Sequence, residues 1–103
     1  MAQNFRRYIA RNVGTSASTL FTANSYDTVI GIGIANTTSS EIKVDVFIND
    51  GSNDYYLIKN APIQSGGALQ VIDGGAKYVV QSADVFKVKS DTASSCDVIV
   101  STV

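Results

Sequence analysis

The chain has 103 residues, of which 45% are hydrophobic and 17% charged, and its formal net charge is −1. This length suits a single domain, and no window approaches the roughly 20 consecutive apolar residues of a membrane-spanning helix, which excludes a helical membrane protein. The near-neutral charge argues against nucleic-acid binding. The first residues lack the apolar run of a secretory signal, so we expect the protein to be assembled in the cytoplasm where it is made.

The first predicted strand, Arg6–Val13, belongs to a basic segment. The first 26 residues contain Arg6, Arg7 and Arg11 and no acid, whereas the rest of the chain contains five lysines and all nine acids. This asymmetry predicts that residues 1–14 form an arm that docks on an acidic neighbour. Neither side of the strand is cleanly apolar, because each side carries an arginine. An ordinary edge strand with snorkelling arginines is the alternative.

The next two predicted strands are Ser18–Thr22 and Thr28–Ala35. In the second, alternation places Ile30, Ile32 and Ile34 on one face and small residues on the other. Gly31 and Gly33 weaken a strand, so we expect another backbone or a bulky side chain close to them. The Gly-x-Gly pattern here lacks the third glycine and the following helix of a dinucleotide site.

The segment Glu41–Asn49 has the clearest strand pattern. Its apolar residues occupy every second position: Ile42, Val44, Val46 and Ile48. A period of two predicts a strand with one face in a core and one face in solvent. A helix would spread these four side chains around its whole circumference, so the helical interpretation fails.

The segment Asn49–Asp54, with the sequence NDGSND, follows this strand and offers several oxygen ligands. It lacks the ligand spacing and the distal glutamate of a calcium-binding EF-hand loop. Asp50-Gly51 is also a common dipeptide of hairpin turns. We therefore predict a plain turn, with a cation site as the alternative.

The next predicted strand, Asp54–Lys59, contains two adjacent tyrosines, Tyr55 and Tyr56. In a regular strand they face opposite ways, which predicts that one points inward and the other outward. An exposed tyrosine could anchor a protein interface or stack on a sugar.

The remaining predicted strands are Ala68–Ile72, Lys77–Gln81, Val85–Lys89 and Cys96–Thr102. Turn-forming sequences separate them: NAPIQSGG, DGG, QSAD and SDTASS. In the last strand, Cys96 is in step with Val98 and Val100, which predicts a buried and unreactive thiol. A single cysteine cannot form an internal disulfide.

About eight short strands, spaced mostly at 8–12 residues and with almost no helix, predict an all-β fold. One layer could not bury so many strands, so we predict an antiparallel β-sandwich of the jelly-roll or Greek-key kind. Residues 1–103 are predicted to form this single domain.

The residue types argue against an enzyme. The chain has no histidine, which removes the usual general base, the Ser-His-Asp triad and most transition-metal sites. One cysteine cannot build a zinc site, and the nine carboxylates are scattered singly. We therefore expect no catalytic residues, no cofactor and no metal.

Three stretches resemble a known group of proteins: FRRYIARNVGTSASTLFTA, IANTTSSEIKVDVFIND, and YYLIKNAPIQSGGALQVIDGGAKYVVQSADVFKVKSDTASSCDVIVS. Their most distinctive parts are the run from YYLIKNAPI to GGAL and the ending KVKSDTASSCDVIVS. Together they resemble small virion structural proteins of tailed bacteriophages, particularly those of cyanobacterial and marine phages. The resemblance implies a β-sandwich subunit on the capsid, neck or tail, usually multimeric and without catalytic residues.

The leading functional hypothesis is a capsid decoration or cement protein in the virion that binds the major capsid protein, other virion subunits and copies of itself, with a trimer favoured. A neck or tail adaptor is a second structural version. A carbohydrate-binding sandwich that contacts host glycan is the alternative from another class. Neither nucleic acid nor membrane is an expected partner. The candidate partner-binding residues are Arg6, Arg7, Tyr8, Arg11, Tyr55 and Tyr56.

Overall fold

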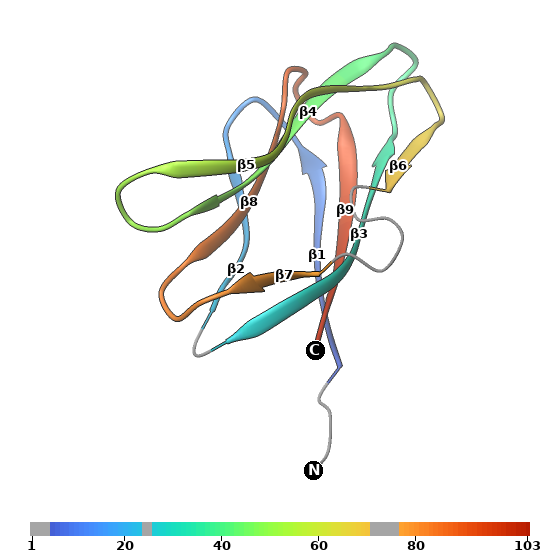
Figure 1. The fold of residues 1–103 in the computed structure, drawn as a ribbon. Coiled ribbons are helices and arrows are strands. Elements are labelled where there is room, and N and C mark those ends of the chain that lie inside the picture. The colour runs from blue at the N-terminus through green and yellow to red at the C-terminus, as the bar shows by residue number, and fades with distance from the viewer. Residues whose placement is uncertain (1–4, 24–25, 71–76) are drawn as a thin grey trace.

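A computed structural model describes residues 5–23, 26–70 and 77–103, and all regular elements in these ranges are β-strands (Figure 1). The predicted all-β antiparallel sandwich is confirmed, with one sheet of five strands and one of four. The strands are β1 (Arg6–Val13), β2 (Ser18–Thr22), β3 (Asp27–Asn36), β4 (Ile42–Asn49), β5 (Asp54–Ile63), β6 (Ala68–Gln70), β7 (Tyr78–Val80), β8 (Val85–Ser90) and β9 (Cys96–Thr102).

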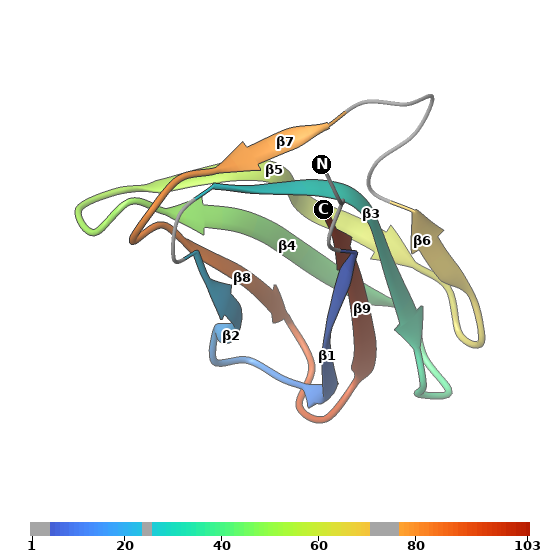
Figure 2. The same ribbon diagram turned by 90° about the horizontal axis from the view of Figure 1, so that it is seen from below.

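The strand order is that of a jelly roll, a long antiparallel hairpin that is rolled into two sheets. The early strands pair with the late strands in reverse order, β1 with β9, β2 with β8, β3 with β6 and β4 with β5. Two further pairings, β3 with β9 and β4 with β8, complete the sheets β1-β9-β3-β6 and β2-β8-β4-β5. Strand β7 is an addition that pairs with the beginning of β3. Figure 2 shows the two sheets from below.

The core lies between the sheets and consists of the alternate side chains that the strand patterns predict. In β4, Ile42, Val44 and Val46 are fully buried, and in β9 the same holds for Val98 and Val100. Three aromatic rings from different strands stack inside one end of the core: the centroids of Tyr8 and Phe21 are 4.4 Å apart, and those of Phe21 and Phe86 are 5.5 Å apart.

The predicted facing of β3 is wrong at one residue. Ile32 and Ile34 are buried as expected, but Ile30 is only half-buried and Val29 occupies the interior position. The pairing of β3 with β9 shifts between Val29 and Gly31, as it does at a β-bulge. Because a bulge adds one residue to one strand, it reverses the alternation on either side of it.

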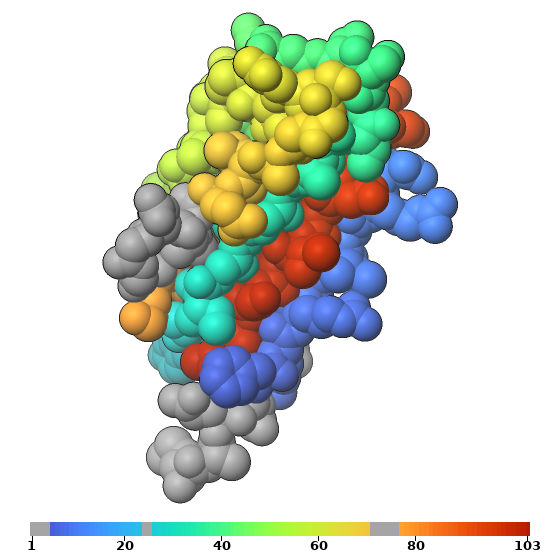
Figure 3. All heavy atoms as spheres, turned by 90° about the vertical axis from the view of Figure 1, so that its right-hand side faces the viewer, coloured from blue at the N-terminus to red at the C-terminus, as the bar shows by residue number. Residues whose placement is uncertain are grey.

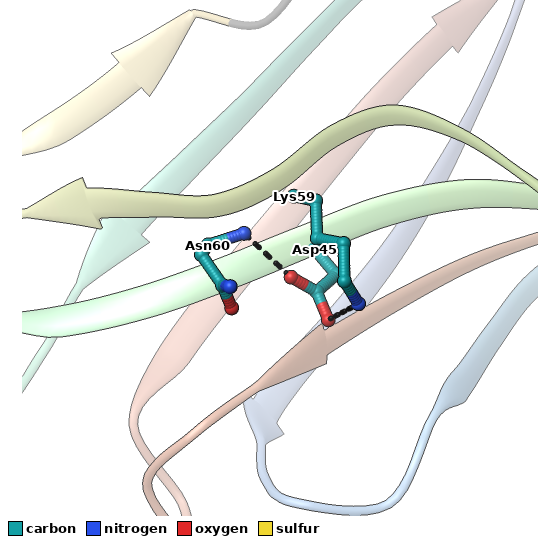
Figure 4. A network of polar contacts seen from close by, with 3 residues as sticks. All are labelled: Asp45, Lys59 and Asn60. Carbon is teal, nitrogen blue, oxygen red and sulfur yellow. Dashed lines mark hydrogen bonds and ion pairs between the residues drawn. The ribbon is translucent and has the colours of Figure 1, made fainter.

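The predicted end of the strand Asp54–Lys59 is also wrong, because β5 continues through Asn60 and Pro62 to Ile63. Asn60 has a φ of 55°, and its backbone N–H donates a hydrogen bond of 2.7 Å to Oδ1 of Asp45 on β4 (Figure 4). Asparagine tolerates this left-handed conformation, so the turn-forming residues produce a bulge inside the strand. Proline is accepted because β5 is an edge strand.

Two predicted strands are shorter in the structure. Strand β6 covers Ala68–Gln70, and the predicted continuation through residues 71 and 72 lies outside the described residues, as does the DGG turn at 73–75. Strand β7 covers Tyr78–Val80, inside the predicted range Lys77–Gln81.

The burial of Cys96 agrees with the prediction, and the same burial raises the pKa of its thiol to about 11. At pH 8.5 the folded protein therefore holds less thiolate than an unfolded chain does. Iodoacetamide at this pH should leave Cys96 unmodified in the folded protein and alkylate it in denaturant, as measured by mass spectrometry. Equal alkylation rates in both states would contradict the burial of Cys96.

Replacing Phe86, which is fully buried, with alanine should lower the free energy of unfolding by about 3–5 kcal/mol, because a large cavity opens between the sheets. Tyr55→Ala is the control, since Tyr55 is 56% exposed and its loss should change the free energy by less than about 0.5 kcal/mol. Urea unfolding followed by circular dichroism measures both values. A similar loss in the two variants would mean that Phe86 does not contribute to the core.

Candidate functional site

The outer side of the β1-β9-β3-β6 sheet forms a flat surface that we call the flat face. Figure 3 shows these four strands side by side, with β1 in blue, β9 in red, β3 in teal and β6 in yellow. The outward side chains are mostly small or apolar, with two arginines at one edge and one aspartate and one glutamine among the rest. The flat face is made of Arg7, Ile9, Arg11, Asp97, Ile99, Ser101, Gly31, Gly33, Ala35, Ala68 and Gln70.

Strand register arranges these residues in rows that cross the sheet. The first row is Arg7, Ser101 and Gly31; the second is Ile9, Ile99, Gly33 and Gln70; the third contains Asp97, Ala35 and Ala68. Arg11 stands at the β1 end of the third row, two residues after Ile9. The bulky side chains therefore lie along β1, and the small ones lie along β3.

Two isoleucines are exposed at the centre of the flat face. Ile9 and Ile99 are directly opposite one another on β1 and β9, and they are 58% and 56% exposed. Ile99 lies between shallow hollows. The hollow toward β1 is also lined by Ile9, and the hollows toward β3 lie over Gly33. Ile9 and Ile99 thus form one exposed apolar patch, and exposed apolar patches are candidate interaction sites.

The two strand glycines differ in what surrounds them. A Cβ atom on Gly33 would lie 3.3 Å from Nε2 of Gln70, which confirms the predicted approach of a bulky side chain. The same prediction is wrong for Gly31, because a Cβ atom there has no heavy atom of the described residues within 4 Å. Neither glycine has the positive φ that would require glycine. Nothing in the described part of the fold demands glycine at position 31.

The described part of the predicted N-terminal arm is an edge strand of the sandwich. Residues 1–4 lie outside the described residues, and β1 pairs with β9 from Arg6 to Val13. Arg6, Arg7 and Arg11 are exposed, and the last two flank Ile9 on the flat face. Tyr8 points to the opposite side and stacks on Phe21, so it belongs to the packing of the core and not to the surface that carries Arg7 and Arg11.

A bulge at Asn12 explains why the sequence pattern of β1 places apolar residues and arginines on the same side of the strand. Asn12 has a φ of 53°, and the pairing with β9 shifts between Ala10 and Val13. The shift returns Val13 to the interior, where it is 1% exposed. The N–H of Asn12 donates a hydrogen bond of 3.0 Å to Oδ1 of Asp97, which holds that carboxylate on the flat face.

The two adjacent tyrosines do not form one platform. They stand opposite Ile48 and Phe47 of β4, so they face opposite ways, but both are exposed, at 56% for Tyr55 and 44% for Tyr56. The prediction of one inward tyrosine is wrong because the end of the β4–β5 hairpin extends beyond the rest of the sandwich (Figures 1 and 2). The centroid of the Tyr56 ring lies 5.0 Å from that of Phe47 and 4.3 Å from Nζ of Lys59, so the ring already contacts two side chains of its own chain.

The opposite outer surface of the sandwich, on the β2-β8-β4-β5 sheet, is rich in lysine. It carries four of the five lysines of the chain: Lys43, Lys59, Lys87 and Lys89. Asp45 is 8% exposed there and lies 3.9 Å from Nζ of Lys59 (Figure 4). Asp91, at the edge of this surface, accepts a hydrogen bond from the backbone N–H of Lys43, which lowers the pKa of its carboxyl.

The segment Asn49–Asp54 forms the predicted hairpin turn. Asp50 accepts hydrogen bonds from the backbone N–H groups of Asn53 and Ser52, which lower the pKa of its carboxyl. Gly51 has a φ of 101°, as glycine in a hairpin turn commonly does. Across residues 5–23, 26–70 and 77–103, no three histidine, cysteine or acidic side chains gather as metal ligands would.

No family model matches the chain, and a search of curated proteins found no match. No helix among the described residues is long and apolar enough to cross a membrane.

Sequence reasoning placed Arg7 and Arg11 on the strand that contributes to the flat face, but it missed Ile9, Ile99 and Gly31 as parts of one surface. The signal for Ile99 was present in the alternation of β9. Cys96, Val98 and Val100 face inward, so the intervening isoleucine must face outward.

Asp45→Ala should lower the free energy of unfolding by about 1–3 kcal/mol, because the backbone N–H of Asn60 loses a charged acceptor at a partly buried position. Asp45→Asn keeps an oxygen acceptor and should lose less. Lys59→Met removes only the ion pair of an exposed lysine and should cost less than about 1 kcal/mol. Thermal unfolding of the three variants ranks their losses in the free energy of unfolding. An equal loss for Asp45→Ala and Lys59→Met would mean that the ion pair, and not the hydrogen bond from Asn60, is responsible.

Proposed function

We propose that the chain is a non-enzymatic structural subunit of a tailed-bacteriophage virion, a capsid decoration or cement protein that attaches to its neighbours through the flat face. The observation that carries the proposal is the exposed pair Ile9 and Ile99 on a sheet of small side chains, with arginines at one edge.

The charges on the two outer surfaces support this assignment of the docking side. The residues of the flat face include two arginines, one aspartate and no lysine, whereas the opposite surface carries Lys43, Lys59, Lys87 and Lys89. Protein interfaces are depleted of charged residues at their centres, enriched in arginine and depleted of lysine. The lysine surface therefore has the character of a solvated side, and the flat face has that of an interface.

The virion context comes from the sequence resemblance and is compatible with the strand order. Jelly-roll sandwiches occur in viral capsid proteins, but they also occur in lectins and in other proteins, so the fold alone does not identify a function. A neck or tail adaptor would use the same flat face and would differ in its location and copy number in the particle.

The glycan-binding alternative receives less support from the arrangement of the tyrosines. A sugar would need an open aromatic face, and the Tyr56 ring already contacts Lys59 and Phe47. Tyr55 is exposed on the other side of the hairpin and stands apart from Tyr56. A glycan array probed with the purified protein tests this alternative directly.

Ile99→Lys should abolish attachment to phage heads, because it places a charge at the centre of the docking surface. The assay is co-sedimentation of the tagged protein with empty heads and, separately, with tails of cyanobacterial tailed phages. Tyr55→Lys is the matched control, since Tyr55 and Ile99 are equally exposed, at 56%, and only Ile99 is on the flat face. Both variants should keep the unfolding midpoint of the wild type.

Binding to heads at high copy number supports decoration, and binding to tails alone moves the proposal to the tail adaptor. Attachment that survives Ile99→Lys but not Tyr55→Lys would place the docking surface at the hairpin. Failure of the wild type to bind either particle would overturn the virion proposal.

A further inference from the structure

We propose that the flat face binds the flat face of a second copy of the chain, with β1 of each copy lying over β3 of the other. This inference rests on the proposed function in one respect, that the flat face is the surface through which a subunit attaches to its neighbours. It names that neighbour as a second copy of the chain, so that the pair, and not a single flat face, is the form that attaches to heads.

Size complementarity across β9 is the first argument. On one side of β9, β1 presents Arg7, Ile9 and Arg11, and on the other side β3 presents Gly31, Gly33 and Ala35 (Figure 3). A two-fold axis parallel to β9 reverses the order of the strands and keeps the rows. It therefore places the bulky side of each copy over the small side of the other, as an isologous interface requires.

The rows make this match residue by residue. Ile9 of one copy lies over Gly33 of its partner, and Arg7 lies over Gly31, the position with open space where a Cβ atom would be. Ile99 is on β9 and meets the same residue of the second copy. Stacked sheets are about 10 Å apart, a gap that one large side chain above a glycine fills.

Charge complementarity is the second argument. Arg11 and Asp97 lie in the same row on neighbouring strands, so the axis sets the two Asp97 side chains opposite one another with an Arg11 beside them on either side, a group of four charges with no net charge. An axis perpendicular to the strands would instead set Arg7 against Arg11 and Ile9 against itself, and it would leave the hollows over β3 empty. The parallel axis therefore places large side chains over small ones, and the two Arg11 side chains balance the facing Asp97 pair.

The opposite surface offers no comparable match. Four lysines from three strands, Lys43, Lys59, Lys87 and Lys89, would face one another in a pair formed there. Like charges placed opposite one another across an interface oppose association. The flat face is thus the surface on which the chain complements itself.

The experiment uses light scattering and sedimentation equilibrium on the full chain, with a dimer expected for the wild type. Gly31→Val adds a β-branched residue where the chain has space and an ordinary backbone conformation. The variant should fold with an unchanged or higher unfolding midpoint, yet its dimerisation constant should weaken by at least about tenfold, because it fills the space that the partner's side chain occupies.

A charge exchange tests the register independently. Arg11→Glu alone and Asp97→Lys alone should each weaken dimerisation by at least about 100-fold, because each leaves four like charges together. An equal mixture of the two variants should restore dimers of mixed composition, identified by native mass spectrometry. Tyr55→Lys should dimerise as the wild type does.

A wild-type monomer, a wild-type trimer, or a dimer that neither Gly31→Val nor the single charge variants weaken would overturn the inference. Failure of the mixture to restore association would overturn the proposed register. A monomer that still binds heads would leave the virion function standing without the pair. A dimer that binds neither heads nor tails would leave the pair standing without the virion function.

Discussion

The pairing of β9 with β1 on one side and β3 on the other closes the rolled hairpin and creates the flat face. The inward residues of β9, Cys96, Val98 and Val100, are fully buried in the core, while Asp97, Ile99 and Ser101 alternate with them on the outside. One seven-residue strand therefore supports both the sandwich and its candidate docking surface. Loss of this strand would remove the centre of the five-stranded sheet and the middle of every row that crosses it.

The two outer surfaces of the sandwich differ in how far their side chains are already in contact with the rest of the chain. On the β4 side, charged groups are contacted by their own chain: Asp45 accepts from the Asn60 N–H, and Lys59 lies over the Tyr56 ring. On the β9 side, Ile9 and Ile99 remain exposed, and the space over Gly31 is open. A strand glycine weakens the isolated domain, and a second copy on the flat face, as we propose, would account for glycine at this position.

Local alternation was sufficient to predict the strands and most of the core, since each strand has one face between the sheets. The errors lie at bulges. One extra residue beside Val29, at Asn12 or at Asn60 reverses or extends a pattern, and the sequence around it carries only a weak signal. The flat face could not be predicted, because it combines four strands whose order depends on pairings between distant segments. The exposure of Tyr55 depended on how far a hairpin extends beyond the other sheet.

The rolled hairpin also determines how long each strand waits for its pairing partner during synthesis. Because β1 pairs with β9, it emerges from the ribosome well before its partner, by about 5–20 s at ordinary rates of synthesis. Throughout that interval β1 and β3 lack the strand that separates them in the finished sheet, and unpaired strands recruit other chains. Arg6, Arg7 and Arg11 are charged, and charged side chains along a strand discourage such pairing. The basic character of β1 thus protects the nascent chain before it has any partner to bind.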